Sequence, residues 1–398
     1  MRPHPPGLAD ILASKTATAM PSVEILPSVA LRQHFSAIDN MMRVFAIQPG
    51  DRVLFLADPL IDPRVIDAVA GIAESRGAVF QVFQAPTTQL PECPAEARPL
   101  VEWASFVVST WFISTSNPLF QKLRREKGQR WVKVTYFRNL DLLHTPQARF
   151  PAELVGEIVR ATARLYPRNC TFDMHISDPR GSDLTIAFTA EMTDNLLSMG
   201  RWEGNDCIAD KPGCYVHYLP VHGPNIYGNS CFKRDRSARP KMGGVVFPQW
   251  AIGFPKPFEE KIGVEYKDGV VQAVHGRSLD AEILRDMLVG VDATLHELGC
   301  GHNPKAPRFA AYPAGSNAPG ALHFGTDSNR PSAYLKRVIP HWEEPATHQD
   351  CVVFDATVKA GNNTLIDNGF LMSLRDEKVV GMASRYGDPV ELLEGFVQ

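Results

Sequence analysis

The stretch RVLFLADPLIDPRVIDAVAGIAESRGAVFQVFQA, residues 52–85, indicates how the fold begins. Its first residues, RVLFLAD (52–58), form a short apolar run that is typical of a buried strand. The segment PRVIDAVAGIAESRGA (63–78) has apolar residues at helical spacing and ends at a glycine, and VFQVFQA (79–85) is typical of the next strand. A strand, a helix and a strand in this order predict a βαβ unit and therefore a parallel sheet.

The same alternation continues towards residue 165. SFVVSTW (105–111) and RWVKVTYF (130–137) are strand-like, and FQKLRREKG (120–128) between them is an amphipathic helix candidate. No G-x-G-x-x-G motif follows the first strand, so we expect no dinucleotide cofactor. Residues 1–165 are therefore predicted to form an α/β domain that serves substrate access and assembly.

Residues 166–398 have a different pattern. CTFDMHIS (170–177) and LTIAFTAE (184–191) flank the turn sequence DPRGSD, which predicts a hairpin. One helix is expected over 279–295. Three further segments are expected to be strands: HQDCVVFDATV (348–358), NTLIDNGFLM (363–372) and EKVVGMA (377–383). This part is predicted to be an α+β, mostly antiparallel-sheet domain.

The composition excludes few classes of protein. The chain of 398 residues has a net charge of −3, which favours neither a nucleic acid nor a membrane surface as partner. It has no apolar run long enough for a membrane span, and its first residues lack the apolar core of a signal peptide. The seven cysteines include no C-x-x-C pair, so we expect reduced thiols and a cytoplasmic protein.

Potential metal ligands are concentrated late in the chain. Six of the twelve histidines fall between residues 275 and 348, where an even spread would place about two. LHELGCGHNPKA (295–306) contains His296, Glu297 and His302. In THQDCVVF, His348 and Asp350 are two residues apart, so on a strand they project from the same face and could hold one metal ion.

The choice between His296 and Glu297 decides the expected metal chemistry. On a regular strand these neighbours face opposite ways, so only one of them would reach a given site. His296 with His348 and Asp350 is a two-histidine, one-carboxylate set, which suits Fe(II) and oxygen chemistry. Glu297 and His323 with His348 and Asp350 suit hydrolysis with Zn²⁺, Mn²⁺ or Co²⁺.

Other polar motifs of the sequence also have ordinary structural explanations. His296 and His302 are six residues apart, which does not match the H-E-x-x-H zinc motif. Lys211, His217 and His222 are candidate acid–base groups near the metal, but a Pro/Gly-rich turn with surface histidines is the slightly favoured interpretation. The basic run CFKRDRSARPK (231–241) fits a solvated loop, or a site for a substrate carboxylate or a neighbouring subunit.

The motifs ELGCGHNPKA, ALHFG and HQD, in this order, resemble the thermophilic aminopeptidase T superfamily of metallopeptidases. In the two-metal aminopeptidases, the resemblance implies Glu297, His323, His348 and Asp350 as ligands. A further glutamate of that pattern is missing, because KPGCYVH places Cys214 at or near its position.

Two other branches of the superfamily imply one metal. The 2,5-dihydroxypyridine 5,6-dioxygenases imply Fe(II) on His296, His348 and Asp350. A branch similar to 5-nitroanthranilate aminohydrolase implies one divalent metal that activates water. This sequence keeps Glu297 and His323, the ligand residues of the hydrolase pattern, which leaves this branch open. The superfamily also implies a homo-oligomer.

Three hypotheses follow. The first is an Fe(II) ring-cleaving dioxygenase that takes a small hydroxylated pyridine-type or other aromatic substrate and O₂, with His217, His222, His323 or Glu297 as catalytic groups. The second is a Zn²⁺, Mn²⁺ or Co²⁺ hydrolase, either an aromatic aminohydrolase or an aminopeptidase. The third is a binding protein whose metal site has decayed.

Overall fold

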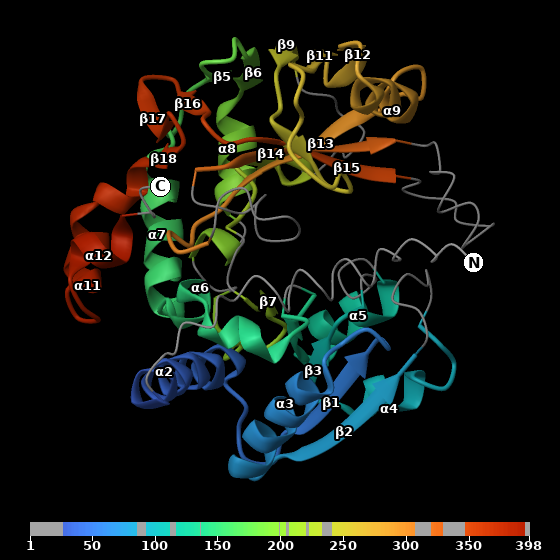
Figure 1. The fold of residues 1–398 in the computed structure, drawn as a ribbon, viewed down its shortest axis with the longest axis vertical. Helices are drawn as coiled ribbons and strands as arrows, with labels where there is room; N and C mark the ends of the chain where they lie inside the picture. Colours follow the sequence, from blue (N-terminus) through green and yellow to red (C-terminus); the bar gives the residue numbers. More distant parts are fainter. Residues whose placement is uncertain are drawn as a thin grey trace, which may run out of the picture.

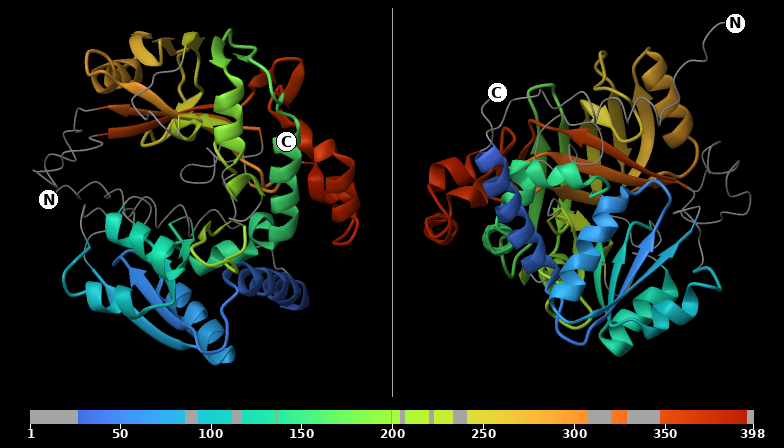
Figure 2. Two further views of the ribbon diagram at one scale, coloured as in Figure 1. Left: turned by 180° about the vertical axis from the view of Figure 1, so that it is seen from behind. Right: turned by 60° about the horizontal axis from the view of Figure 1, so that its bottom comes forward.

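The computed structural model describes residues 27–85, 93–111, 117–135, 137–198, 200–203, 207–219, 223–232, 241–306, 320–328 and 347–394. Two sheets occupy opposite halves of the molecule (Figures 1 and 2). One is parallel and has five strands, and the other is a curled antiparallel sheet of thirteen. The predicted fold class, an α/β part and a mostly antiparallel α+β part, is confirmed.

The parallel sheet has the strand order β2-β1-β3-β4-β7. Its strands are β1 (Arg52–Ala57), β2 (Val79–Gln84), β3 (Phe106–Ser109), β4 (Arg130–Lys133) and β7 (Tyr215–His217). The helices between its strands are α3 (Pro63–Ser75), α4 (Arg98–Trp103) and α5 (Pro118–Lys127). β3 and β4 are buried along their whole length, because apolar clusters cover both faces of the sheet. The predicted βαβ alternation is therefore confirmed.

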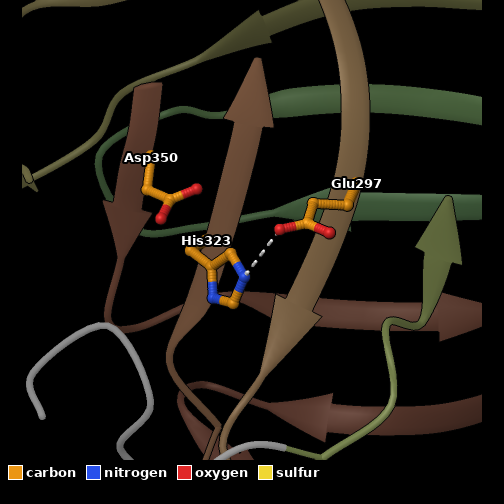
Figure 3. A group of neighbouring side chains, drawn as sticks. All are labelled: Glu297, His323 and Asp350. Atoms are coloured by element: carbon orange, nitrogen blue, oxygen red, sulfur yellow. Dashed lines mark ion pairs between the residues drawn. The ribbon is translucent and has the colours of Figure 1, made fainter. Parts of the chain in front are cut away.

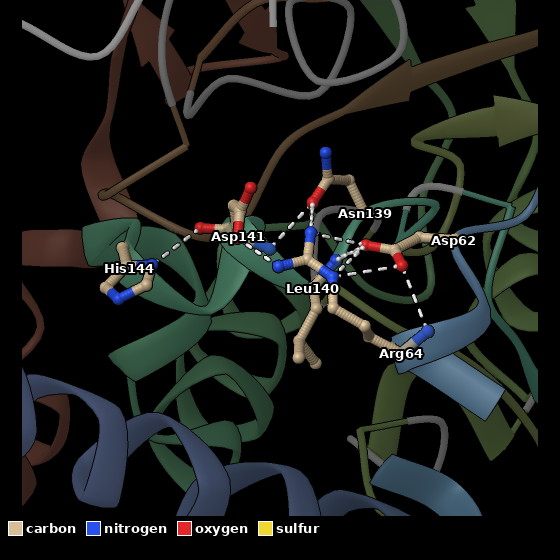
Figure 4. A network of polar contacts seen from close by, with 6 residues as sticks. All are labelled: Asp62, Arg64, Asn139, Leu140, Asp141 and His144. Atoms are coloured by element: carbon tan, nitrogen blue, oxygen red, sulfur yellow. Dashed lines mark hydrogen bonds and ion pairs between the residues drawn. The ribbon is translucent and has the colours of Figure 1, made fainter. Parts of the chain in front are cut away.

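The ends of α3 and α5 follow from their cap residues. Asp62 accepts a hydrogen bond from the Arg64 backbone N–H at the start of α3. Arg64 in turn contacts Asn139 and Asp141, so the start of α3 is joined to η2 (Leu140–His144) (Figure 4). Helix α5 ends at Gly128, whose φ of 63° is a conformation that favours glycine.

The last strand of the parallel sheet comes from beyond residue 165. β7 pairs in parallel with β4, with Val132 opposite Val216 and Lys133 opposite His217. The division into domains 1–165 and 166–398 stays a prediction, but the two parts are interleaved at this strand. The chain returns from β7 to the large sheet at β8 (Tyr227–Gly228), which pairs with β13 (Thr294–Cys300).

The large sheet has the order β10-β15-β14-β13-β12-β11-β9-β6-β5-β16-β17-β18. Its further strands are β5 (Phe172–Ser177), β6 (Asp183–Phe188), β9 (Met242–Val246), β10 (Trp250–Ala251), β11 (Gly263–Lys267), β12 (Val270–His275), β14 (Leu322–Ser328), β15 (Thr347–Val353), β16 (Thr357–Ala360), β17 (Asn363–Asp367) and β18 (Phe370–Leu371). The hairpin predicted around DPRGSD is confirmed by the β5–β6 pair.

Helix α7 (Ala152–Arg164) runs along one side of both halves (Figure 1). It packs against α11 (Glu377–Ala383) and against α2 (Pro27–Phe45). Most of its side chains are buried, which matches a helix enclosed by other elements. The remaining helical segments are α6 (Pro146–Arg149), α8 (Ala190–Leu197), α9 (Leu279–Leu288), α12 (Pro389–Leu393), η3 (Gly200–Glu203), η4 (Asn229–Cys231) and η6 (Met372–Arg375).

Two predicted elements were wrong. The helix expected over 279–295 ends at Leu288, because Gly290 and Asp292 have positive φ and turn the chain into β13. The strand expected over 377–383 is helix α11. Asp376 caps this helix by accepting a hydrogen bond from the Lys378 backbone N–H, and Val379 and Ala383, four residues apart, are buried on one face.

The remaining expectations concern cysteines and membranes. All seven cysteines are free, and only Cys170 among them is exposed. Within the described ranges, no helix is long and apolar enough to cross a membrane.

Candidate metal centre

The candidate centre lies on one face of three neighbouring strands. In the antiparallel register, Glu297 of β13 is opposite Gly325 of β14, and Gly325 is opposite Asp350 of β15. Side chains in such a row share a face of the sheet, and His323, two residues before Gly325, shares it too. Figure 3 shows Glu297, His323 and Asp350 converging from the three strands.

The distances between these side chains suit a metal ion. One ligand atom each from Glu297, His323 and Asp350 lies within 4.8 Å of the other two. His348 adds a fourth donor, since its Nε2 lies 3.1 Å from Asp350 Oδ1 and 3.5 Å from Glu297 Oε1. We call Glu297, His323, His348 and Asp350 the donor group.

Two glycines leave room for the donor group. A Cβ atom on Gly325 would lie 2.6 Å from Glu297 Cγ and 2.9 Å from His348 Cε1. A Cβ atom on Gly299 would lie 2.2 Å from Cε1 of His323. Both distances are shorter than side-chain contacts allow, so these strand positions require glycine.

A β-bulge places His296 and Glu297 on the same side. The β13–β14 register shifts between Leu295 and Glu297, so His296 is the extra residue. His296 Nδ1 lies 3.0 Å from Asp327 Oδ2, and its ring stands perpendicular to that of His348 at 5.9 Å between centroids. The assumption of a regular strand, on which these neighbours would face opposite ways, was therefore wrong. Of the two, only Glu297 belongs to the donor group.

Asp327 is a site residue that sequence reasoning missed. It lies directly opposite His348 in the β14–β15 ladder, and its Oδ1 lies 2.6 Å from His348 Nδ1. The signal was present in LHFGTD, because His323, Gly325 and Asp327 are spaced by two and so share one face of the strand.

Hydrogen bonds and charges polarise the centre. Burial would lower the pKa of His348, but its hydrogen bond to Asp327 and the adjacent carboxylates of Asp350 and Glu297 raise it well above its ordinary value. Burial would raise the pKa of Glu297, but a hydrogen bond from His348 and the nearby imidazoles hold it far below its usual range. The pKa of Asp350 is lowered in the same way, against burial, by the close approach of the His348 imidazole. The carboxylates are therefore ionised at neutral pH.

These residues fit a divalent metal ion. The donor group offers two imidazoles and two carboxylates, the ligand types that bind Zn²⁺, Mn²⁺, Co²⁺ or Fe(II). Asp350 Oδ1 is buried and accepts no hydrogen bond of good geometry from the described residues, although His348 Nε2 lies 3.1 Å away. Asn225 holds the outer oxygen of Glu297 by donating a 2.5 Å hydrogen bond to Oε2.

The other predicted residues are not members of the donor group or lie outside the described residues. His217 is on β7 in the parallel sheet, where its ring packs edge-on against Tyr215. His222 lies outside the described residues. His302 is fully buried beside Trp202, and burial lowers its pKa to about 4, so it is a neutral core histidine. The rejection of an H-E-x-x-H site agrees with this position.

Comparison with solved structures places the fold. 2,5-Dihydroxypyridine dioxygenase from Pseudomonas putida KT2440 aligns over 88% of this chain and 99% of that chain, with a TM-score of 0.59 and 16% sequence identity. The two chains share one fold. The resemblance stated from the sequence is thereby confirmed at the level of the fold.

Wild-type AmpT from Thermus thermophilus aligns over 85% of this chain and 98% of that chain, with a TM-score of 0.48 and 14% identity. No family model and no curated protein sequence matches this sequence.

Proposed function

We propose that this protein is a divalent-metal hydrolase with one metal ion held by Glu297, His323, His348 and Asp350. The observation that carries this proposal is the convergence of Glu297, His323 and Asp350 within 4.8 Å on three adjacent strands. A divalent ion bound there would act as a Lewis acid and lower the pKa of water. The presence of Glu297 and His323 beside His348 and Asp350 gives two carboxylates and two imidazoles, a donor set that suits hydrolysis with Zn²⁺, Mn²⁺ or Co²⁺.

The chain's own residues prepare the site. Asn225 orients the Glu297 carboxylate, and the two glycines let the ligands approach each other. A single ion is preferred over two, because the resemblance places Cys214 at or near the position of the further glutamate of the aminopeptidase pattern. Cys214 is buried in the core of the parallel-sheet half. We therefore place an aromatic aminohydrolase ahead of an aminopeptidase, with a small aromatic substrate and a homo-oligomeric assembly as further parts of the proposal.

A second candidate function is an Fe(II) ring-cleaving dioxygenase. It is favoured by the fold shared with 2,5-dihydroxypyridine dioxygenase and by the presence of His323, His348 and Asp350, which are themselves a two-histidine, one-carboxylate set. The ligand set predicted from the sequence used His296 instead of His323. We favour His323, because its ring nitrogen lies within 4.8 Å of ligand atoms of Glu297 and Asp350, a group that does not include His296.

Metal analysis and turnover with and without O₂ test the proposal. The protein is purified without chelator, its metal content is measured, and 5-nitroanthranilate and 2,5-dihydroxypyridine are offered under nitrogen and in air. We expect about one Zn²⁺, Mn²⁺ or Co²⁺ per chain and product from 5-nitroanthranilate under nitrogen. Iron content with O₂ uptake on 2,5-dihydroxypyridine would instead support the dioxygenase. A chain that binds no divalent metal would contradict both.

A further inference from the structure

Asp327 lies beside the donor group without belonging to it. Its two carboxylate oxygens contact two different histidines: Oδ1 lies 2.6 Å from His348 Nδ1 and Oδ2 lies 3.0 Å from His296 Nδ1. The contact with His348 joins directly opposed residues of β14 and β15, and the contact with His296 reaches the bulged position of β13. One side chain therefore ties three strands together beside the site.

The contact with His348 decides which ring nitrogen faces the donor group. Because Nδ1 donates to Asp327, Nε2 is the nitrogen directed at Asp350 and Glu297, at 3.1 and 3.5 Å. A carboxylate on one ring nitrogen fixes the tautomer and orientation of a histidine, and it makes the other nitrogen a better metal ligand.

The contact with His296 uses the second oxygen of the same carboxylate. The bulge brings His296 to the face that carries Glu297, and Asp327 holds it there with its ring perpendicular to that of His348. His296 therefore lines the site on the side next to His348.

We infer that Asp327 is a positioning residue of the metal centre, which holds His348 with Nε2 towards the ion and draws His296 against it. The inference rests on the proposed metal function, since it assigns a role towards the same site. It differs from the ligand set itself, because Asp327 acts through His348 and His296 and does not hold the ion.

The test compares Co²⁺ binding to the wild type, Asp327→Asn, Asp327→Glu and the control Asp183→Asn. Asp183 pairs with His175 at 2.9 Å on the β5–β6 hairpin, so the control removes the same kind of contact elsewhere in the large sheet. Calorimetry measures the affinity, and the visible absorption of bound Co²⁺ reports the ligand geometry. Thermal denaturation shows that each variant is folded.

We expect Asp327→Asn to weaken Co²⁺ binding by about ten- to a hundredfold and to change the absorption bands, with Asp327→Glu in between and Asp183→Asn unchanged. If Asp327→Asn does not fold, a weaker affinity and altered bands in Asp327→Glu support the same inference. Wild-type affinity and spectrum in both Asp327 variants would overturn the inference alone. A wild type that binds no divalent ion would overturn the proposed function and the inference together.

Discussion

At the scale of single residues, the candidate site depends on a position without a side chain as much as on the ligand side chains themselves. Gly325 has no side chain, and this lets Glu297, His348 and Asp350 approach one another across β14. The donor types could be recognised in the sequence from their spacing, but the need for glycine between them follows only from the register of three strands.

The substitution Gly325→Ala should weaken metal binding. Its Cβ would lie 2.6 Å from Glu297 Cγ and 3.1 Å from Asp350 Oδ1, so these side chains must move apart. Changes that disturb the orientation of metal ligands typically lower metal affinity by at least about tenfold. We therefore expect a loss of Co²⁺ affinity of about tenfold or more, measured by calorimetric titration. The control is Gly243→Ala on β9, where the nearest atom is at an ordinary contact distance of 3.7 Å. Equal affinity in both variants would contradict the site geometry.

Metal affinity should rise with pH. The pKa of His348 is raised, so the metal-free protein keeps a proton on this residue at neutral pH, and an ion at Nε2 must displace it. The pKa values of Glu297 and Asp350 are lowered, so these carboxylates stay ionised over the same range. We expect the affinity to fall by up to about tenfold per pH unit below the pKa of His348. Titrations in buffers of different ionisation enthalpy should detect the released proton, and a pH-independent affinity would contradict the assignment of His348.

At the scale of elements, apolar periodicity predicted the type of α9 but not the side chains that it buries. Leu279, Ile283, Leu284 and Leu288 are all apolar residues at helical spacing. Leu279 and Ile283 are nevertheless exposed, whereas Leu284 and Leu288 are buried. A helix contacts its neighbours along one stripe only, and the tertiary structure decides where that stripe lies.

Two substitutions at adjacent positions of α9 distinguish a buried apolar residue from an exposed one. Leu284→Ala removes a fully buried side chain and should lower the free energy of unfolding by about 3 kcal/mol. Ile283→Ala removes a side chain that is 41% exposed and should change the free energy of unfolding by less than about 0.5 kcal/mol. Urea unfolding followed by circular dichroism measures both. Similar losses for the two variants would mean that Ile283 is buried by a contact that this structure lacks.

At the scale of the whole molecule, Arg130 joins segments from distant parts of the chain. From β4 its guanidinium pairs with Asp51, which immediately precedes β1, and donates to the carbonyls of Ala46, at 2.9 Å, and Ala209, at 3.0 Å. Arg130 and Asp51 are both only 11% exposed in their side chains. These contacts connect the end of α2, the start of β1 and the segment that leads to β7.

The substitution Arg130→Met should destabilise the protein strongly. It leaves Asp51 buried without its opposite charge and removes hydrogen bonds to two carbonyls, which should cost about 3–5 kcal/mol. Arg43→Met is the control, because Arg43 pairs with Asp39 at an exposed position. Its loss should lower the free energy of unfolding by less than about 1 kcal/mol. Thermal unfolding of both variants tests the difference, and equal midpoints would contradict the role of Arg130.

The sequence by itself determined the class of the fold and most of the donors. The βαβ alternation, the DPRGSD hairpin and the shared face of His348 and Asp350 are local patterns with a period of two or about 3.6 residues, so they need no knowledge of distant segments. Only the tertiary structure decided the bulge at His296, the approach of His323 to Glu297, the contacts of Asp327 and the entry of β7 into the parallel sheet. Each of these depends on the register between strands far apart in the chain, and that register is set by packing across the whole sheet.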